Sequence, residues 1–230
     1  MSSIERLVRA IIAGTSVQGR YMRQHLQGFA HVVGPRKLVF DVGGGNSLYK
    51  RWFPCGRYIS MDVRVYDGTH VLADACQLPF GNEVSDLVLC TEVLEHVTDS
   101  QKTLAELGRV LMPGGYLVVS TPLVWGVHDV PDFRRWTDIG IVDHLRQAGF
   151  EVVAVRKRGG IFTAIGALLA QAPLQVFLPG DTPRTWPRAA LFIGSYLVLA
   201  PLAWSLRLLD FLDRQKNFTV GYCVLCRRPK

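Results

Sequence analysis

A glycine-rich turn directly after a short apolar strand is the feature that most restricts the fold of this chain. Residues 38–47 read L-V-F-D-V-G-G-G-N-S, so the strand carries Asp41 near its end and runs into three consecutive glycines. A second apolar stretch, Y-I-S-M-D, ends in Asp62. Nucleotide-type ligands bind where the carboxyl ends of neighbouring parallel strands meet. Glycines let the backbone approach such a ligand, and a strand-terminal acid accepts hydrogen bonds from two ribose hydroxyls.

The spacing of the glycines disfavours pyrophosphate cofactors. A dinucleotide fingerprint has glycine at its first, third and sixth positions, but here Gly43 and Gly45 are followed by Leu48 at the last of them. Lys50 lacks the G-K-S/T context of a phosphate-binding loop. The turn instead resembles the first motif of class I S-adenosylmethionine-dependent methyltransferases, in which the loop faces the amino-acid part of the cofactor.

Further segments resemble later motifs of the same family, in the same order. Residues 73–80 (A-D-A-C-Q-L-P-F) are similar to its D-A-x-x-L-P-F segment, and residues 91–97 (T-E-V-L-E-H-V) to its E-V-L-E-H motif. Residues 109–117 (R-V-L-M-P-G-G-Y-L) are similar to the R-V-L-K-P-G-G turn before the fifth strand. The resemblance implies S-adenosyl-L-methionine as cofactor. It assigns the methionine part to the first turn, the ribose to the second strand's acid and the adenine amine to the D-A segment. The implied cofactor-binding residues are Asp41, Gly43, Gly44, Gly45, Asp62, Asp74, Ala75 and Cys90.

The alternation of strand-like and helical segments predicts an α/β fold with a doubly wound, mostly parallel seven-stranded sheet. The resemblance implies that the seventh strand is antiparallel and lies beside the sixth. We expect a single domain with a hydrophobic helical insertion between these two strands. The expected parts are an N-terminal helical cap at 1–34 with helices at 3–13 and 17–32, a cofactor-binding core at 37–155, the insertion at 159–214 and a final strand at 218–226. The other strands are expected near 37–42, 57–62, 69–72, 86–90, 115–121 and 149–155.

Composition limits the partners and the compartment. A net charge of +7 is compatible with nucleic acid, an anionic membrane or an anionic substrate. Enzymes that methylate base amino groups resemble one another in an N/D/S-P-P-aromatic motif after the fourth strand, where this chain has Cys90-Thr91-Glu92-Val93, so no nucleic-acid partner is expected. Five irregularly spaced cysteines without a secretory leader favour the reducing cytoplasm. Cys223 and Cys226 lack a second pair, and no metal site is expected. The oligomeric state stays open.

The predicted insertion contains two stretches without a charged residue, 159–180 and 189–206. Each has about the length of a membrane span. The last strand must return to the sheet, so the chain crosses a bilayer twice or not at all. Three alternatives follow: helices lying in the membrane interface, a lid in a soluble enzyme, and a membrane hairpin. The sequence favours interfacial helices, anchored by two tryptophans and reaching headgroups with arginines. These residues are Trp186, Trp204, Arg184, Arg188, Arg207 and Arg214.

Two histidines are candidates for a catalytic base. Methyl transfer from a sulfonium mainly requires orientation, and a base is needed only when the acceptor carries a proton, as a hydroxyl does. His128 begins the run H-D-V-P-D-F-R-R-W-T, which resembles a segment of a bacterial subgroup often encoded near genes for cell-surface glycan and lipid assembly. Asp129 or Asp132 is the expected partner that orients it, and His96 of the E-V-L-E-H motif is the second candidate.

These observations lead to three functional hypotheses. The favoured one is a methyltransferase that acts, at oxygen, on a lipid-linked, glycan or other hydrophobic small molecule, in the cytoplasm and at the inner face of the cytoplasmic membrane. The second is a soluble enzyme that methylates a diffusible metabolite. The third is a methyltransferase fold that binds without turnover; degenerate copies usually lose the glycines or the ribose acid, and this chain retains both.

Overall fold

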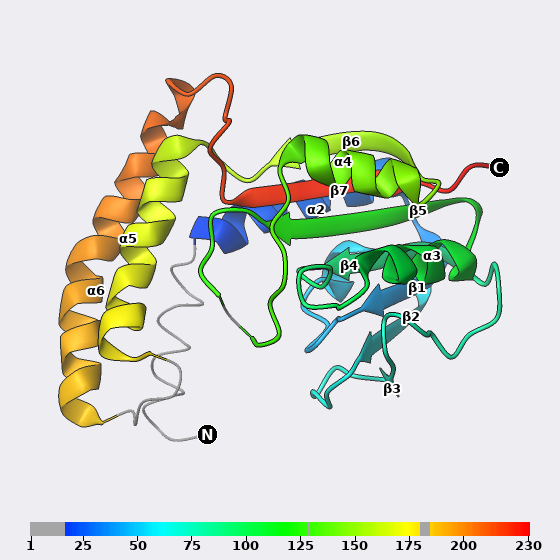
Figure 1. Ribbon diagram of the computed structural model, residues 1–230, viewed down its shortest axis with the longest axis horizontal. Helices are drawn as coiled ribbons and strands as arrows, with labels where there is room; N and C mark the ends of the chain where they lie inside the picture. The colour runs from blue at the N-terminus through cyan, green and yellow to red at the C-terminus, as the bar shows by residue number, and fades with distance from the viewer. Residues whose placement is uncertain (1–16, 128, 180–184) are drawn as a thin grey trace. The chain divides into compact units, whose positions relative to one another are not determined.

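The computed structural model of the chain describes residues 17–127, 129–179 and 185–230, so the helix expected at 3–13 and residue His128 lie outside the described residues. The chain divides into two compact units. One contains Met1–Arg23 and Lys157–Val220, and the other contains Gln24–Arg156 and Gly221–Lys230. Figure 1 shows the second unit as a sheet with flanking helices.

The seven-stranded sheet has the order β3-β2-β1-β4-β5-β7-β6. Strands β1, β2, β3, β4 and β5 pair in parallel, and β7 runs antiparallel to β5. The predicted mostly parallel sheet, with its last strand antiparallel beside the sixth, is confirmed. The strands are β1 (Arg36–Val42), β2 (Cys55–Asp62), β3 (Val71–Leu72), β4 (Ser85–Thr91), β5 (Leu111–Pro122), β6 (Glu151–Lys157) and β7 (Gly221–Arg227).

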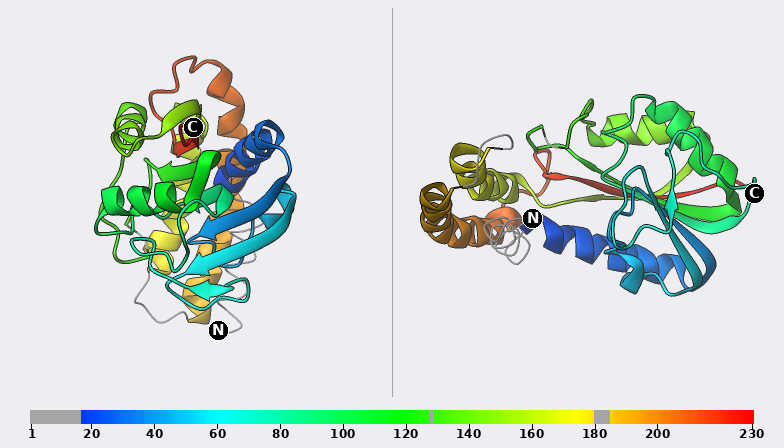
Figure 2. Two further views of the ribbon diagram at one scale, coloured as in Figure 1. Left: turned by 90° about the vertical axis from the view of Figure 1, so that its right-hand side faces the viewer. Right: turned by 90° about the horizontal axis from the view of Figure 1, so that it is seen from below.

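Helices cover both faces of the sheet (Figure 2). Helix α2 (Val17–Val33) lies on one face, and α3 (Ser100–Val110) and α4 (Asp138–Gln147) lie on the other. Both α3 and α4 begin at a side chain that caps a backbone N–H: Asp99 accepts from Lys102 N, and Thr137 accepts from Gly140 N. Their buried leucines pack on alternate residues of β1, β4, β5 and β7, and the residues between these are mostly buried too, as expected of strands covered on both faces.

Several predicted strand boundaries differ from the structure: the sixth strand, expected at 149–155, spans Glu151–Lys157, and the final strand, expected at 218–226, spans Gly221–Arg227. The third strand is shorter than expected, because Thr69 lies in a turn in which its N–H donates to Tyr66 O at 3.0 Å. The fifth strand starts earlier than expected, at Leu111, because the residues before the Pro-Gly-Gly turn already pair with β4. The register shifts between Ser85 and Leu87 on β4 to accommodate this turn.

The other unit contains two long apolar helices that lie side by side, α5 (Ile161–Phe177) and α6 (Trp186–Leu206), followed by the short 3-10 helix η2 (Arg207–Phe211) (Figure 1). Two carboxylates after α6 cap the first turn of α5. Asp210 accepts from Gly160 N at 2.8 Å and Thr163 N at 3.1 Å, and Asp213 accepts from Ile161 N at 2.8 Å. The beginning of α5 is therefore fixed to the end of α6.

Within the described ranges, one helical segment, Trp186–Phe211, is long and apolar enough to cross a membrane. Only 28% of its most apolar 18 residues are buried inside the protein. Ile161–Phe177 is a shorter apolar helix.

Candidate cofactor and acceptor site

The glycine turn at the carboxyl end of β1 has a shape that only glycine permits. Gly43 has a φ of +70°, and a Cβ there would lie 2.2 Å from Val93 Cγ2. A Cβ on Gly44 would lie 2.3 Å from Ser60 Oγ and 2.4 Å from Asp41 Oδ2. Backbone N–H groups of Gly43 and Gly44 both donate to Met61 O, at 2.8 and 3.1 Å. The turn thus presents bare backbone, which suits the close approach of a ligand.

Asp62 ends β2 beside this turn, as predicted. Its Oδ2 accepts from Gly45 N at 3.1 Å, and its Oδ1 accepts from Arg64 N at 3.0 Å. A carboxylate has about four acceptor positions, so two remain for the hydroxyls of a ribose. One side chain therefore both stabilises the turn and offers the oxygens that such a ligand needs.

Asp41 lies completely buried beneath the turn. Tyr58 Oη donates to its Oδ2 at 2.6 Å. Among the described residues, Asp41 Oδ1 has no hydrogen-bond partner. Burial raises the pKa of Asp41 to about 7, the Tyr58 hydrogen bond partly opposes this rise, and the charge of Asp62 adds to it. A cationic ligand at the turn would stabilise the ionised form of this carboxyl group.

The remaining predicted cofactor residues lie at the same edge of the sheet. Asp74 is exposed after β3, where its Oδ1 accepts from Cys76 N at 2.8 Å, and the adjacent Ala75 is buried. Cys90 is fully buried near the end of β4, and burial, the charge of Glu95 and the charge of Asp41 all raise the pKa of its thiol. Cys90 therefore contributes volume and a neutral surface rather than a nucleophile.

His96 lies in the loop after β4 and contacts the loop that follows β5. Its Nδ1 lies 2.7 Å from Pro131 O. A carbonyl oxygen only accepts, so Nδ1 carries a proton and donates it. The other ring nitrogen, Nε2, lies 3.8 Å from a carboxylate oxygen of the buried Glu95. These contacts fix the plane and the tautomer of the imidazole ring.

Three further interactions fasten the loop after β5 to the loop after β4. Phe133 N donates to Glu95 O at 2.7 Å. The guanidinium of Arg134 donates to Val97 O and Thr98 O, each at 2.6 Å. The segment from Pro131 to Arg134, together with its contacts to Glu95, His96, Val97 and Thr98, is called the strap below.

The predicted partners of His128 differ in their surroundings. Asp129 is exposed and has a φ of +45°, a conformation that is strained for a residue with a side chain. Asp132 forms a bidentate ion pair with Arg135, at 2.5 and 2.7 Å. Arg135 also donates to Trp125 O and Gly126 O, at 3.3 and 3.2 Å. The carboxylate of Asp132 thus orders the loop, whereas that of Asp129 faces solvent next to His128.

Sequence reasoning missed Tyr58 and Glu92. Ser60 pairs with Asp41 in the parallel register of β1 and β2, and Tyr58 lies two positions before Ser60. Residues two apart in a strand share a face of the sheet, so this spacing could have placed Tyr58 on the same face as Ser60. Glu92 has a φ of +53° and accepts from Ser120 Oγ at 2.8 Å, at the carboxyl ends of β4 and β5. No pattern in the sequence indicated that strained backbone.

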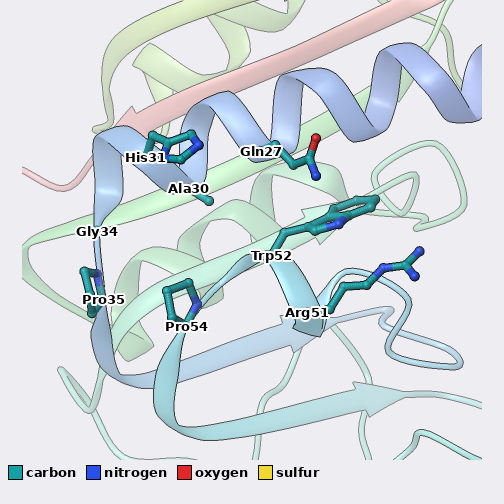
Figure 3. A pocket seen from close by; sticks show the side chains of 8 residues that line it. All are labelled: Gln27, Ala30, His31, Gly34, Pro35, Arg51, Trp52 and Pro54. Carbon is teal, nitrogen blue, oxygen red and sulfur yellow. The ribbon is translucent and has the colours of Figure 1, made fainter.

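The described residues contain no group of three histidine, cysteine or acidic side chains that would hold a metal ion. All five cysteines are free thiols, and Cys223 and Cys226 are buried in β7. A separate hollow lies at the amino ends of β1 and β2 (Figure 3). Its walls include Gln27 and His31 of α2 and, before β2, Arg51 and Trp52. It lies at the sheet edge opposite the glycine turn.

Comparisons with known proteins agree with this geometry. A family model described as a methyltransferase domain matches residues 40–119. The O-methyltransferase cnsE of Penicillium expansum is 35% identical over 95 residues, which cover 36% of this chain and 34% of that protein. The demethylmenaquinone methyltransferase of Mycolicibacterium paratuberculosis is 47% identical over 120 residues, covering 46% of this chain and 51% of that protein. The chain thus spans about half the length of these curated relatives, or less.

Among solved structures, the 1,6-didemethyltoxoflavin-N1-methyltransferase of Burkholderia thailandensis, which has S-adenosylhomocysteine bound, superposes with a TM-score of 0.56. The two chains are 15% identical, and the match covers 99% of this chain and 87% of the other. At this level of identity the likeness establishes the Rossmann-like fold.

Proposed function

We propose that this protein, whose residues 40–119 match a methyltransferase domain, transfers the methyl group of S-adenosylmethionine to an oxygen of a lipid-linked, glycan or other hydrophobic small molecule. The observation that carries the proposal is the strap, which holds the segment next to His128 and Asp129 beside the carboxyl ends of β4 and β5. Strands of a doubly wound sheet present their ligands at this edge.

The residues of the turn fit the cofactor. When bound, the cofactor supplies a methyl group on a positively charged sulfur. In the proposal, the bare backbone of Gly43, Gly44 and Gly45 receives the amino-acid part, with Asp41 beneath it. Asp62 binds the ribose hydroxyls, and Asp74 accepts from the adenine amine, with Ala75 and Cys90 forming the neighbouring apolar wall.

Oxygen acceptors need a base, and we assign that role to His128. Its neighbour Asp129 is the group that orients the imidazole, because Asp132 is already paired with Arg135. His128 would take the proton of the acceptor hydroxyl as that oxygen accepts the methyl group, which the cofactor would supply when bound. His96 remains a possible second base only at Nε2, because its Nδ1 already donates to Pro131 O.

The apolar helices suggest where the acceptor is found. Residues 159–214 expose many large aliphatic side chains, and a hydrophobic or lipid-linked acceptor partitions into a membrane. The proposal therefore places the enzyme at the cytoplasmic face of the membrane, with residues 159–214 making the contact. A soluble enzyme with a lid would instead leave the protein in the aqueous fraction.

The first test is calorimetric titration with S-adenosylmethionine and S-adenosylhomocysteine. Replacing Asp62→Ala removes hydrogen bonds to a charged group, each worth about 1.5–3 kcal/mol, so affinity should fall at least about tenfold. Asp62→Asn still accepts from Gly45 N and separates the effect on the ribose from the effect on the turn. Asp67→Ala, an exposed acid in the same loop, should bind like the wild type.

The acceptor is then sought with radiolabelled cofactor and fractionated lipid, glycan and aqueous extracts. Label that moves into an organic-soluble product, and that is lost with His128→Ala but not with Asp67→Ala, supports the proposal. A well-folded wild-type protein that binds neither ligand would overturn it and favour a fold that binds a partner without turnover.

A further inference from the structure

Phe192 and Tyr196 of α6 pack near Leu174 and Phe177 of α5 in one part of the seam between these helices. The other part of the seam is built mainly from small residues. Ala164, Ala167, Ala200 and Ala203 are all buried there. A Cβ placed on Gly166 would lie only 2.7 Å from Ala203 O, so the two helix backbones approach closely at this point. Close contact through glycine and alanine is characteristic of helix pairs in lipid, where van der Waals packing replaces the hydrophobic effect.

Large aliphatic side chains point away from this seam. Leu168 of α5 is 50% exposed, and Leu197 and Val198 of α6 are 68% and 71% exposed. The exposed half of α6 between residues 189 and 206 carries no charged side chain. A helix lying in the membrane interface requires a polar face toward water, and a surface helix of a soluble protein turns its leucines inward. Neither description fits α6.

Both ends of α6 carry the residues that anchor a spanning helix. Trp186 and Arg188 stand in its first turn, and Trp204 and Arg207 at its end. The guanidinium carbons of Arg207 and Arg20 lie 4.6 and 5.9 Å from the centre of the Trp204 ring. At 1.5 Å per residue the two tryptophans are about 27 Å apart, close to the roughly 30 Å of the hydrocarbon layer. Tryptophan and arginine prefer the two borders of that layer.

We propose that α5 and α6 form a hairpin that crosses a phospholipid bilayer, with their aliphatic side chains among the acyl chains. The chain enters α5 and leaves η2 at the same end of the hairpin, where Asp210 and Asp213 cap α5, so the methyltransferase domain stays on one side. That end carries the excess of Lys and Arg expected on the cytoplasmic side: Arg20, Lys157, Arg207, Arg214 and Lys216. The hairpin would bring the enzyme to a lipid-linked acceptor in the membrane, and this part of the inference rests on the proposed function.

Polar residues in α5 are compatible with this arrangement. Pro173 is buried and Gln171 is half-buried, so both face protein rather than lipid. Gln175 is exposed but lies in the last turn, near the border of the layer. Proline is tolerated in membrane helices when neighbouring groups pack around it.

The test adds purified full-length protein to preformed vesicles of phosphatidylethanolamine and phosphatidylglycerol. We expect the protein to float with the vesicles and to resist extraction by alkaline carbonate. In intact vesicles the tip of the inserted hairpin lies in the lumen, where added trypsin cannot reach it. Trypsin should therefore cut at Arg184 and Arg188 only after detergent opens the vesicles. Val198→Arg places a charge on the exposed centre of α6 and should reduce the bound fraction about tenfold or more. Val32→Arg, the same change on an exposed valine of α2, is the matched control and should bind like the wild type.

Two results would overturn the hairpin. Release by carbonate together with cleavage of the tip in intact vesicles would mean that the helices lie in the interface. Failure to float, with self-association in solution that Val198→Arg abolishes, would mean that a second copy of the chain covers α6. Calorimetric titration of the same samples keeps the two proposals separate, because Val198→Arg leaves the cofactor site intact and should bind S-adenosylhomocysteine like the wild type.

Discussion

Asp41 shows how much a single buried group adds to what the sequence predicts. Its place at the end of a strand before the glycines was predictable from the motif, and its pairing with β2 followed from the parallel sheet. Its protonation was not, because that depends on complete burial and on the bond from Tyr58, which only the folded structure provides. The consequence is a carboxyl group that titrates near neutral pH beneath the cofactor turn.

Asp41 should make the unliganded protein less stable as the pH rises. Its pKa in the folded state, about 7, lies above the ordinary value of 3.8 for an aspartate, so between these values the folded state binds the proton and the unfolded state does not. Stability should therefore fall from about pH 4 to pH 7, by as much as about 4 kcal/mol in the limit. Urea unfolding at several pH values measures this slope. Asp41→Asn should flatten it, and the exposed control Asp143→Asn should not; equal slopes in all three proteins would show that Asp41 is ionised throughout.

The strap is a property of two loops that are distant in sequence. The motif 91–97 and the run 128–137 were each recognisable, but all the acceptors of the hydrogen bonds between them are main-chain carbonyls, which leave no pattern in the sequence. For the same reason the capping of α5 by Asp210 was not predictable, although the apolar stretch that forms α5 was. Regular elements follow from periodicity, whereas contacts between loops depend on the assembled fold.

His96 should act by holding the strap. Replacing His96→Ala removes the hydrogen bond to Pro131 O, worth about 0.5–1.5 kcal/mol, so amide hydrogen exchange in residues 129–137 should accelerate by up to about tenfold. His96→Asn should restore protection, because the side-chain amide can donate from nearly the position of Nδ1. Methyl transfer that is lost in His96→Asn while the strap stays protected would instead identify His96 as the base.

The molecule as a whole combines a basic charge with a pair of apolar helices, and in the proposed hairpin these two features would contribute differently to membrane binding. The resemblance in sequence predicted a mostly parallel sheet whose last strand is antiparallel beside the sixth. Which residues face each other across the α5–α6 seam could not be predicted from the sequence. In the sequence alone, Gly166 and Ala203 do not differ from other small residues. Only the structure shows that they lie in contact.

Salt should distinguish these two contributions. Attraction between the net charge of +7 and anionic headgroups is screened within about 8–10 Å at physiological ionic strength, whereas buried aliphatic area is not. Raising the salt concentration from about 0.05 to 0.5 M should slow binding to phosphatidylglycerol vesicles, while protein that is already bound should stay bound. Complete release by salt, measured by flotation, would show that charge alone holds the protein on the surface.

The capping carboxylates at the foot of the hairpin have a consequence for how this chain can vary. Asp210 and Asp213 accept hydrogen bonds from the backbone at the start of α5. Residues 160–213 therefore begin and end at the same place. The strands on either side, β6 and β7, are already neighbours. A short turn between them would complete the same sheet, so a chain that lacks residues 160–213 should still be able to form all seven strands.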